Sequence, residues 1–175
     1  MTKELINQEP NSTLGVDGTF KYEHIRNGKV IDSWKEPNIV VDQGLIYMLN
    51  TGIGNVSQNS NWYIGLFQNN YTPLASDTAA IFPGAGAGNE ATIEYDEATR
   101  PVFTPVATNA KVITNTSAAY TFNAATSIYG AFMISDSTKG GVSGTLLSAS
   151  KFGAVRQMQA LDVLNVTYEL TIADV

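Results

Sequence analysis

The sequence predicts an all-β protein: an antiparallel β-sandwich of jelly-roll-like topology with one short helix and an extended N-terminal arm, or else a partly closed barrel. Of the 175 residues only 15% are charged and 45 are Ser, Thr or Asn, which favours strands and loops over solvent-facing helices. Residues 164–172 alternate strictly between apolar and polar, with the period of a half-buried strand. Asn27-Gly28, between two β-prone runs, is typical of a tight hairpin.

The N-terminal arm is expected over residues 1–16, before a single sandwich domain at residues 17–175. The arm is polar, and Pro10 and Gly15 argue against one continuous helix or strand there. Ordering such a segment on a partner costs about 1–2 kcal/mol per residue, so the arm must bury apolar side chains when it binds. The candidates for this role are Leu5, Ile6 and Leu14.

The first hairpin is predicted around the turn at Asn27-Gly28. A type I′ turn needs positive φ at both central residues, and it would pair His24 with Ile31. This register divides the apolar side chains between two faces, with Ile25, Val30 and Trp34 on one and Phe20, Tyr22 and Ile31 on the other. A hairpin that is apolar on both faces is either sandwiched or packed against a partner.

One helix, about two turns long, is predicted over residues 43–50. Asp42 is its candidate N-cap, and Gly52 is a natural C′ residue that ends it. Its apolar stripe consists of Leu45, Ile46 and Leu49.

Several strands are predicted in the rest of the chain. Residues 61–67 form a buried strand, with Trp62, Ile64 and Leu66 on one face and Tyr63 and Phe67 on the other. The connection over residues 68–91 is longer than most loops, so we expect it to be functional or held by contacts. Pro101 and Pro105 interrupt residues 93–108, which indicates an edge strand. The other predicted strands cover residues 119–122, 128–134, 145–152 and 164–172.

The composition excludes several classes of chemistry. The chain has no cysteine and one histidine, which rules out thiol catalysis, disulfides and a multi-histidine metal site. A net charge of −6 does not suit a polycationic nucleic-acid binder, and no apolar run approaches the ~20 residues of a membrane helix. We therefore expect a protein that is not an enzyme, has no cofactor and makes no direct contact with nucleic acid or membrane.

Two features that could indicate a functional site, His24 and the glycine-rich run at residues 84–88, are better explained by a structural role. His24 as a catalytic base would need a nucleophile and an orienting acid, and no Gly-x-Ser-x-Gly motif supplies the first. The run from Gly84 to Gly88 lacks the Lys-Ser/Thr of a phosphate-binding loop, so we interpret it as a flexible turn.

A cluster of acids precedes Arg100. Such carboxylates could serve glycoside hydrolysis or bind calcium, but the calcium-loop pattern is missing and a solvated acidic loop is favoured. Arg100 is expected to pair with one of these acids, which are Glu90, Glu94, Asp96 and Glu97.

Aromatic side chains gather at residues 62–71. They could stack sugars or bases, but their alternation favours packing in the core. They are Trp62, Tyr63, Phe67 and Tyr71. Tyr71, close to Pro73 in the long connection, is the expected exposed contact.

Several segments together resemble a family of small structural proteins of tailed-bacteriophage particles, across residues 17–172. These segments are Glu23–Asp32, Pro37–Leu45, Trp62–Phe67, Asn70–Pro73, Ser76–Ala79, Tyr129–Gly141, Leu147–Phe152 and Asp162–Tyr168. The resemblance implies a virion component and brings no catalytic residues with it.

We infer from this resemblance a capsid decoration or cement protein that binds and stabilises the assembled head. Its expected partners are the major capsid protein or other virion proteins, and it would form a homo-oligomer in the particle after synthesis in the bacterial cytoplasm. A tail, collar or baseplate component and a carbohydrate-binding module on the tail are the alternatives. The predicted partner-binding residues are Leu5, Ile6, Leu14, Tyr71 and Pro73.

Overall fold

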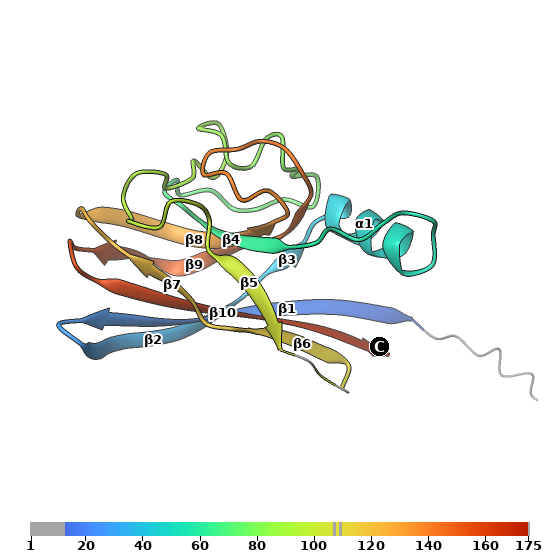
Figure 1. Cartoon of the computed structure of the whole chain (residues 1–175), viewed down its shortest axis with the longest axis horizontal. Coiled ribbons are helices and arrows are strands. Elements are labelled where there is room, and N and C mark those ends of the chain that lie inside the picture. The colour runs from blue at the N-terminus through green and yellow to red at the C-terminus, as the bar shows by residue number, and fades with distance from the viewer. Residues whose placement is uncertain (1–12, 107, 109, 175) are drawn as a thin grey trace, which may run out of the picture.

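Two antiparallel sheets packed face to face form the body of the protein (Figure 1). This computed structural model describes residues 13–106, 108 and 110–174. In chain order the elements are β1 (Leu14–Arg26), β2 (Lys29–Pro37), β3 (Ile39–Val40), α1 (Asp42–Gly52), β4 (Trp62–Phe67), β5 (Val102–Val106), β6 (Val112–Thr116), β7 (Ala118–Thr121), β8 (Thr126–Ile134), β9 (Leu146–Met158) and β10 (Val163–Asp174). The predicted all-β sandwich with a short helix is confirmed.

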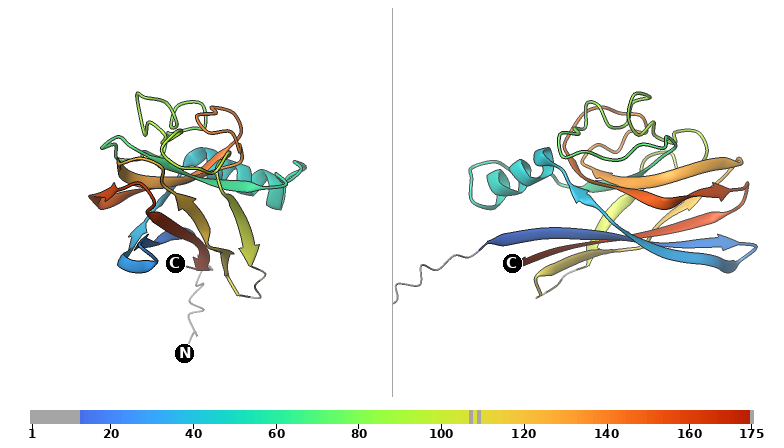
Figure 2. Two further views of the ribbon diagram at one scale, coloured as in Figure 1. Left: turned by 60° about the vertical axis from the view of Figure 1, so that its left-hand side comes forward. Right: turned by 180° about the vertical axis from the view of Figure 1, so that it is seen from behind.

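The strands follow one hydrogen-bonded path that folds into two layers. Their order is β2-β1-β10-β6-β5-β4-β8-β9-β3, with β7 paired to β10. We call the layer of β2, β1, β10, β7 and β6 sheet A, and the layer of β4, β8, β9 and β3 sheet B (Figures 1 and 2). The first and last strands are neighbours, so both ends of the described chain belong to sheet A.

β5 joins the two sheets, and the prediction of an edge strand there is wrong. Its first residues pair with β4, where Phe103 lies opposite Trp62, and its last residues pair with β6, where Pro105 lies opposite Asn115. Pro105 is tolerated because β4 pairs only with residues 102 and 103, so no ladder bond is lost on that side.

The sandwich is also joined at its other edge. The chain passes there from β2 to β3 through Asn38, whose backbone N–H donates to the Gly18 carbonyl at 3.1 Å. Nearby, the Gly153 N–H of β9 donates to Glu36 Oε1 of β2 at 2.8 Å. Connections at both edges hold the two sheets in a fixed relation.

The main core lies between the two sheets and is rich in aromatic side chains. Its largest buried members are Phe20, Tyr22, Tyr95, Tyr120, Phe122 and Tyr168. The predicted alternation in β10 is confirmed, because Leu164 and Val166 are buried, and among its alternating apolar side chains only Ile172 is exposed.

The turn of the first hairpin is confirmed, but the predicted register beyond it is wrong. Asn27 and Gly28 have φ of 51° and 73°, as a type I′ turn requires. A β-bulge then shifts the pairing, so that His24 lies opposite Asp32. The shift moves Trp34 to the opposite face of the hairpin from the predicted one.

The bulge allows Trp34 to pack in the core. Its ring stacks on Tyr22 with centroids 5.0 Å apart and meets the Phe152 ring edge-on at 5.3 Å. Ile31, at the bulge, is exposed instead. Burial of the larger aromatic side chain is the physical reason for the altered register.

The predicted boundary between arm and domain is also corrected. Residues 14–16 belong to β1, where Leu14 lies opposite Asp174 and Val16 opposite Ile172. Backbone pairing with β10 extends the strand toward the N-terminus despite Gly15. The predicted arm residues Leu5 and Ile6 lie outside the described residues.

Residues 68–91 cover the outer face of sheet B and form a third layer (Figure 1). Phe82 of this layer packs against Phe67 of β4 and Phe132 of β8, with centroids 5.4 and 5.2 Å apart. The expectation that this connection is held by contacts is confirmed. The two faces of β4 are also as predicted, because Ile64 and Leu66 lie in the main core and Phe67 lies in the outer one.

Candidate interaction surface

One face of α1 is apolar and exposed to solvent. Ile46 and Leu49 are three residues apart and share one side of the helix, and Ile53 is the C-cap residue that follows its last turn. They are 58%, 61% and 89% exposed, respectively. The predicted apolar stripe thus exists, but Ile46 and Leu49 point to solvent. A helix with an apolar outer face is unusual, because surface helices normally present polar residues there.

The opposite face of α1 is held against the end of sheet B, which determines the helix's orientation. Gly44 is buried against the Leu147 backbone so closely that a side chain would collide with it. Tyr47 meets the Trp62 ring edge-on at 5.2 Å. Because this inner face is fixed, Leu49 cannot turn inward.

The predicted caps of α1 are not those observed. Val41 is the N-cap and Gly52 is still helical, while Asp42 makes no side-chain cap bond. The start of the helix is held by tertiary bonds instead: the Asp42 N–H donates to the Ala75 carbonyl at 2.9 Å. Backbone contacts from the third layer therefore replace the local cap that was predicted.

The exposed face of α1 lies in a long stretch without charge. Residues 43–76 contain no Asp, Glu, Lys, Arg or His, although the whole chain carries a net charge of −6. Covering this face with a partner would therefore desolvate no charged side chain within the stretch. This gap in the charge pattern is the signal by which the surface could have been found in the sequence.

Two apolar hollows lie next to α1, at the same end of the sandwich. One of about 230 Å³ is lined by Tyr47 and Met48 of the helix and reaches Ile113 and Leu170. The second, of about 500 Å³, shares Ile113 and Leu170 and continues to Leu14. Together they form an open groove at the end of sheet A, and α1 lines only its smaller part, through Tyr47, Met48 and Thr51 and not through the exposed Ile46 and Leu49.

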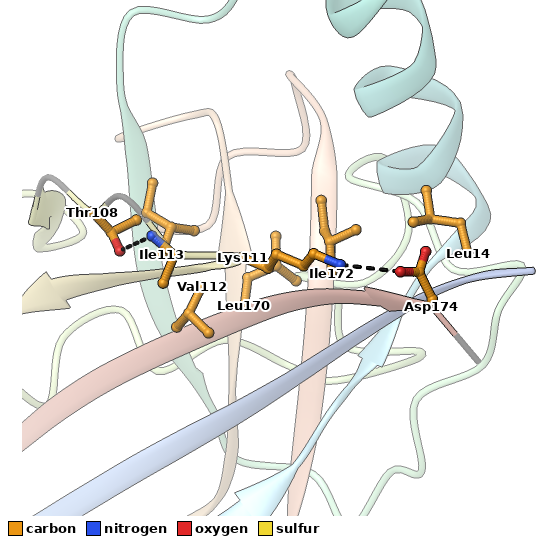
Figure 3. Close-up of a pocket in the computed structure, with 9 residues that line it drawn as sticks. Leu14, Thr108, Lys111, Val112, Ile113, Leu170, Ile172 and Asp174 are labelled. Carbon is orange, nitrogen blue, oxygen red and sulfur yellow. Dashed lines mark hydrogen bonds and ion pairs between the residues drawn. The ribbon is translucent and has the colours of Figure 1, made fainter.

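The rim of the larger hollow carries one ion pair. Figure 3 shows Lys111 Nζ donating to Asp174 Oδ2, at 3.1 Å, beside Leu14 and Ile172. Both charged side chains are mostly exposed, so the pair contributes little to stability. The apolar lining is the distinctive property of the groove.

The predicted partner-binding residues lie in different parts of the molecule. Leu14 is 63% exposed and lines the groove. Tyr71 and Pro73 lie in the third layer and are only partly exposed. The Tyr71 ring packs on Phe82 with centroids 5.9 Å apart, and its hydroxyl donates to Asp77 Oδ1 at 2.9 Å. Tyr71 therefore helps to hold the third layer and is not the free contact that was predicted.

Arg100 forms a fully buried ion pair with Glu90 beneath the third layer. Its Nε and Nη2 donate to the two carboxylate oxygens at 2.8 and 2.6 Å. Arg100 also donates to the carbonyls of Asp136 and Gly141, while the Gly140 N–H donates to Glu90. The predicted pairing of Arg100 is confirmed, but the prediction of a solvated acid is wrong for Glu90, whose charge is buried with its partner.

The neighbouring acids take separate structural partners. Glu94 accepts from Gln68 Nε2 at 3.0 Å, and Glu97 accepts from the Thr121 backbone N–H at 3.1 Å. In residues 13–106, 108 and 110–174, no three His, Asp or Glu side chains gather as a metal site would need. Glu97 thus holds its loop to β7, and Glu94 holds the same loop to the residue that follows β4.

His24 belongs to a buried polar cluster at the other end of the sandwich. Its Nε2 lies 2.8 Å from Asp162 Oδ2, and Arg26 donates to both oxygens of the same carboxylate at 2.8 and 2.7 Å. These hydrogen bonds, chiefly those from Arg26, hold the pKa of Asp162 well below its usual range. The arrangement joins the hairpin to the turn before β10, which supports a structural role for His24.

Comparison with protein-family models and with curated proteins finds no match to this chain. Among the helices of the described residues, none is long and apolar enough to cross a membrane.

Proposed function

We propose that this protein is a structural component of a tailed-bacteriophage particle, a decoration or cement protein that binds and stabilises the assembled capsid. The observation that carries this proposal is the exposed apolar face of α1, formed by Ile46 and Leu49 within the uncharged stretch of residues 43–76. An exposed apolar patch on a folded domain is typical of a surface that meets another protein.

The position of the resembling segments supports the proposal. Trp62–Phe67 is β4, Tyr129–Ile134 lies in β8 and Leu147–Phe152 lies in β9. These three strands are consecutive neighbours in sheet B. The resemblance to phage structural proteins therefore covers a continuous part of the fold, as expected when it reflects a common architecture.

The architecture also suits this function. Sheets joined at both edges, with a buried ion pair beneath the third layer and a partly buried one at the hairpin end, give a stiff domain. A stiff domain loses little conformational entropy on binding, and many copies on a repeating lattice gain from multivalency even when each contact is weak.

The number of copies per particle tests the proposal. Particles from a culture that produces this protein are purified, and its amount relative to the major capsid protein is measured by quantitative mass spectrometry. Hundreds of copies per particle are expected for a capsid decoration protein. A few dozen copies, in multiples of three or six, would instead indicate a tail or baseplate component. Absence from the particles would overturn the proposal.

Deleting residues 1–12 tests the contribution of the arm. The deletion must stop there, because residues 14–16 pair with β10. We expect an unchanged circular dichroism spectrum and loss of co-sedimentation with particles. Full binding by the shortened protein would remove the arm from the mechanism.

A further inference from the structure

We propose that residues 1–12 turn back on their own copy and add a strand to the free edge of β1, with Leu5 against the apolar groove. The inference goes beyond the proposed function, because it concerns the chain by itself and needs no capsid. It names the occupant of the groove: a segment of this chain, and not a second copy or the shell.

The edge of β1 that faces away from β10 is unpaired where the strand begins. β10 pairs with β1 from Leu14 to Ile25, whereas β2 pairs with it only from Thr19 onward. In the part of the chain that the structure describes, no strand pairs with residues 14–17 on that edge. Such an edge presents backbone N–H and C=O groups that can take up another strand.

The backbone groups of Val16 point to this unpaired edge. The Gly18 carbonyl accepts from the Asn38 N–H at 3.1 Å, on the side of β2. Backbone groups alternate in direction along a strand, so those of Val16 point to the same side as those of Gly18. Those of Gly15 and Asp17 point toward β10 instead. An added strand would therefore pair with the N–H and C=O of Val16.

The sequence before β1 suits a reversal of the chain. Pro10-Asn11 is typical of the two central positions of a type II turn, because Pro fixes the first φ and Asn tolerates the positive second one. A two-residue turn there places Leu5 opposite Val16, since both lie five residues from the turn. Opposite residues of an antiparallel pair have their side chains on the same face, so Leu5 would lie beside the Val16 side chain.

The groove offers Leu5 an apolar surface. Val16 lies opposite Ile172 in β10, so Leu5, Val16 and Ile172 would form a row across three strands. Ile172 and Leu14 line the larger hollow together (Figure 3) and are 39% and 63% exposed. Covering these side chains with Leu5 removes apolar surface from water and stabilises the added strand.

The segment of the same copy is favoured over any segment of another copy. It is joined directly to Leu14, which itself lines the groove, and a short tether gives an effective concentration in the millimolar range. Each copy carries a net charge of −6, which opposes the approach of a second one. A segment already ordered on its own domain also loses less entropy when the protein binds a capsid.

Amide hydrogen exchange resolved by residue with NMR tests the added strand. The full chain is compared with the chain that lacks residues 1–12. We expect the Val16 N–H to exchange at least about ten times faster after the deletion, because it loses its acceptor. The N–H groups of Gly15 and Asp17, which point toward β10, are internal controls and should keep their rates. An unchanged rate at Val16 would overturn the inference.

Cross-linking of the full-length chain tests the position of Leu5, because the chain has no cysteine of its own. Leu5→Cys is combined either with Ile172→Cys or with Val155→Cys as a matched control, since Ile172 and Val155 are 39% and 38% exposed. Val155 lies between Gly153 and Arg156, which bond to β2 at the other end of the sandwich.

With a short bis-maleimide, we expect the intramolecular link between positions 5 and 172 to form at least about ten times faster than in the control. The two positions would be two strands apart, which is about 10 Å. Equal rates would contradict the proposed docking. Cross-linked dimers in place of the monomeric product would show that the segment reaches another copy, and the inference would fail.

The two proposals can fail separately. If the deletion abolishes co-sedimentation with particles but leaves the Val16 exchange rate unchanged, the inference fails and the proposed function stands. If the Val16 rate rises as expected but the protein is absent from particles, the proposed function fails and the inference stands.

Discussion

The outer face of sheet B and the outer face of α1 are both apolar, but only the first is covered by another part of the chain. Residues 68–91 cover the first with a layer that contains Phe82 and closes over the Glu90–Arg100 pair. Nothing in the described residues covers the second, where Leu49 is exposed. One apolar surface therefore stabilises the fold, while the other is available to a partner.

The two regions also differ in charge. The covered face holds one buried ion pair, Glu90–Arg100, which also accepts hydrogen bonds from and donates them to the distant loop at residues 136–141. The open face has no charge at all over residues 43–76. Substitutions in the first region should unfold the protein, and substitutions in the second should change only its association.

Arg100→Met should have the largest effect on stability. It leaves the Glu90 carboxylate buried without its cation, and breaking a buried pair in this way costs about 3–5 kcal/mol. The free energy of unfolding is measured by urea denaturation. The double variant with Glu90→Gln removes the orphaned charge and should recover part of the loss. A cost below about 1 kcal/mol for Arg100→Met would show that the third layer does not depend on this pair.

Lowering the pH should destabilise the protein through Asp162, by less than Arg100→Met does and by more than Leu49→Ser does. Because the folded state lowers the pKa of this carboxyl group, the stabilisation is present above its unfolded pKa of about 3.9 and is lost as the pH falls below it. The loss should be on the order of 2 kcal/mol. Unfolding free energies between pH 6 and pH 2 should fall less steeply in Asp162→Asn. Parallel curves for the two proteins would contradict this assignment.

Leu49→Ser should have the smallest effect on stability, within about 0.5 kcal/mol, because the side chain is already exposed in the isolated fold. Thermal unfolding of the dilute protein measures this effect. A loss of several kcal/mol would mean that α1 is covered within a single copy, and the contrast between the two regions would disappear.

Local chemistry made part of this structure predictable. The turn at Asn27-Gly28 follows from the positive φ that its two residues accept, and the buried face of β10 follows from a period of two. The pairing of Arg100 with an acid could be expected from their closeness in the sequence. Of the predicted contact residues, Leu14 lines the groove, whereas Tyr71 packs on Phe82 in the third layer.

Features that depend on distant partners could not be predicted. The bulge that carries Trp34 into the core, the crossing of β5 between the sheets and the orientation of α1 each depend on which surfaces meet in space. The amino-acid sequence determines where the apolar residues stand and with what period they recur along the chain. Only packing decides which apolar face is buried and which is left open, because burial is a property of two surfaces in contact and not of one segment alone.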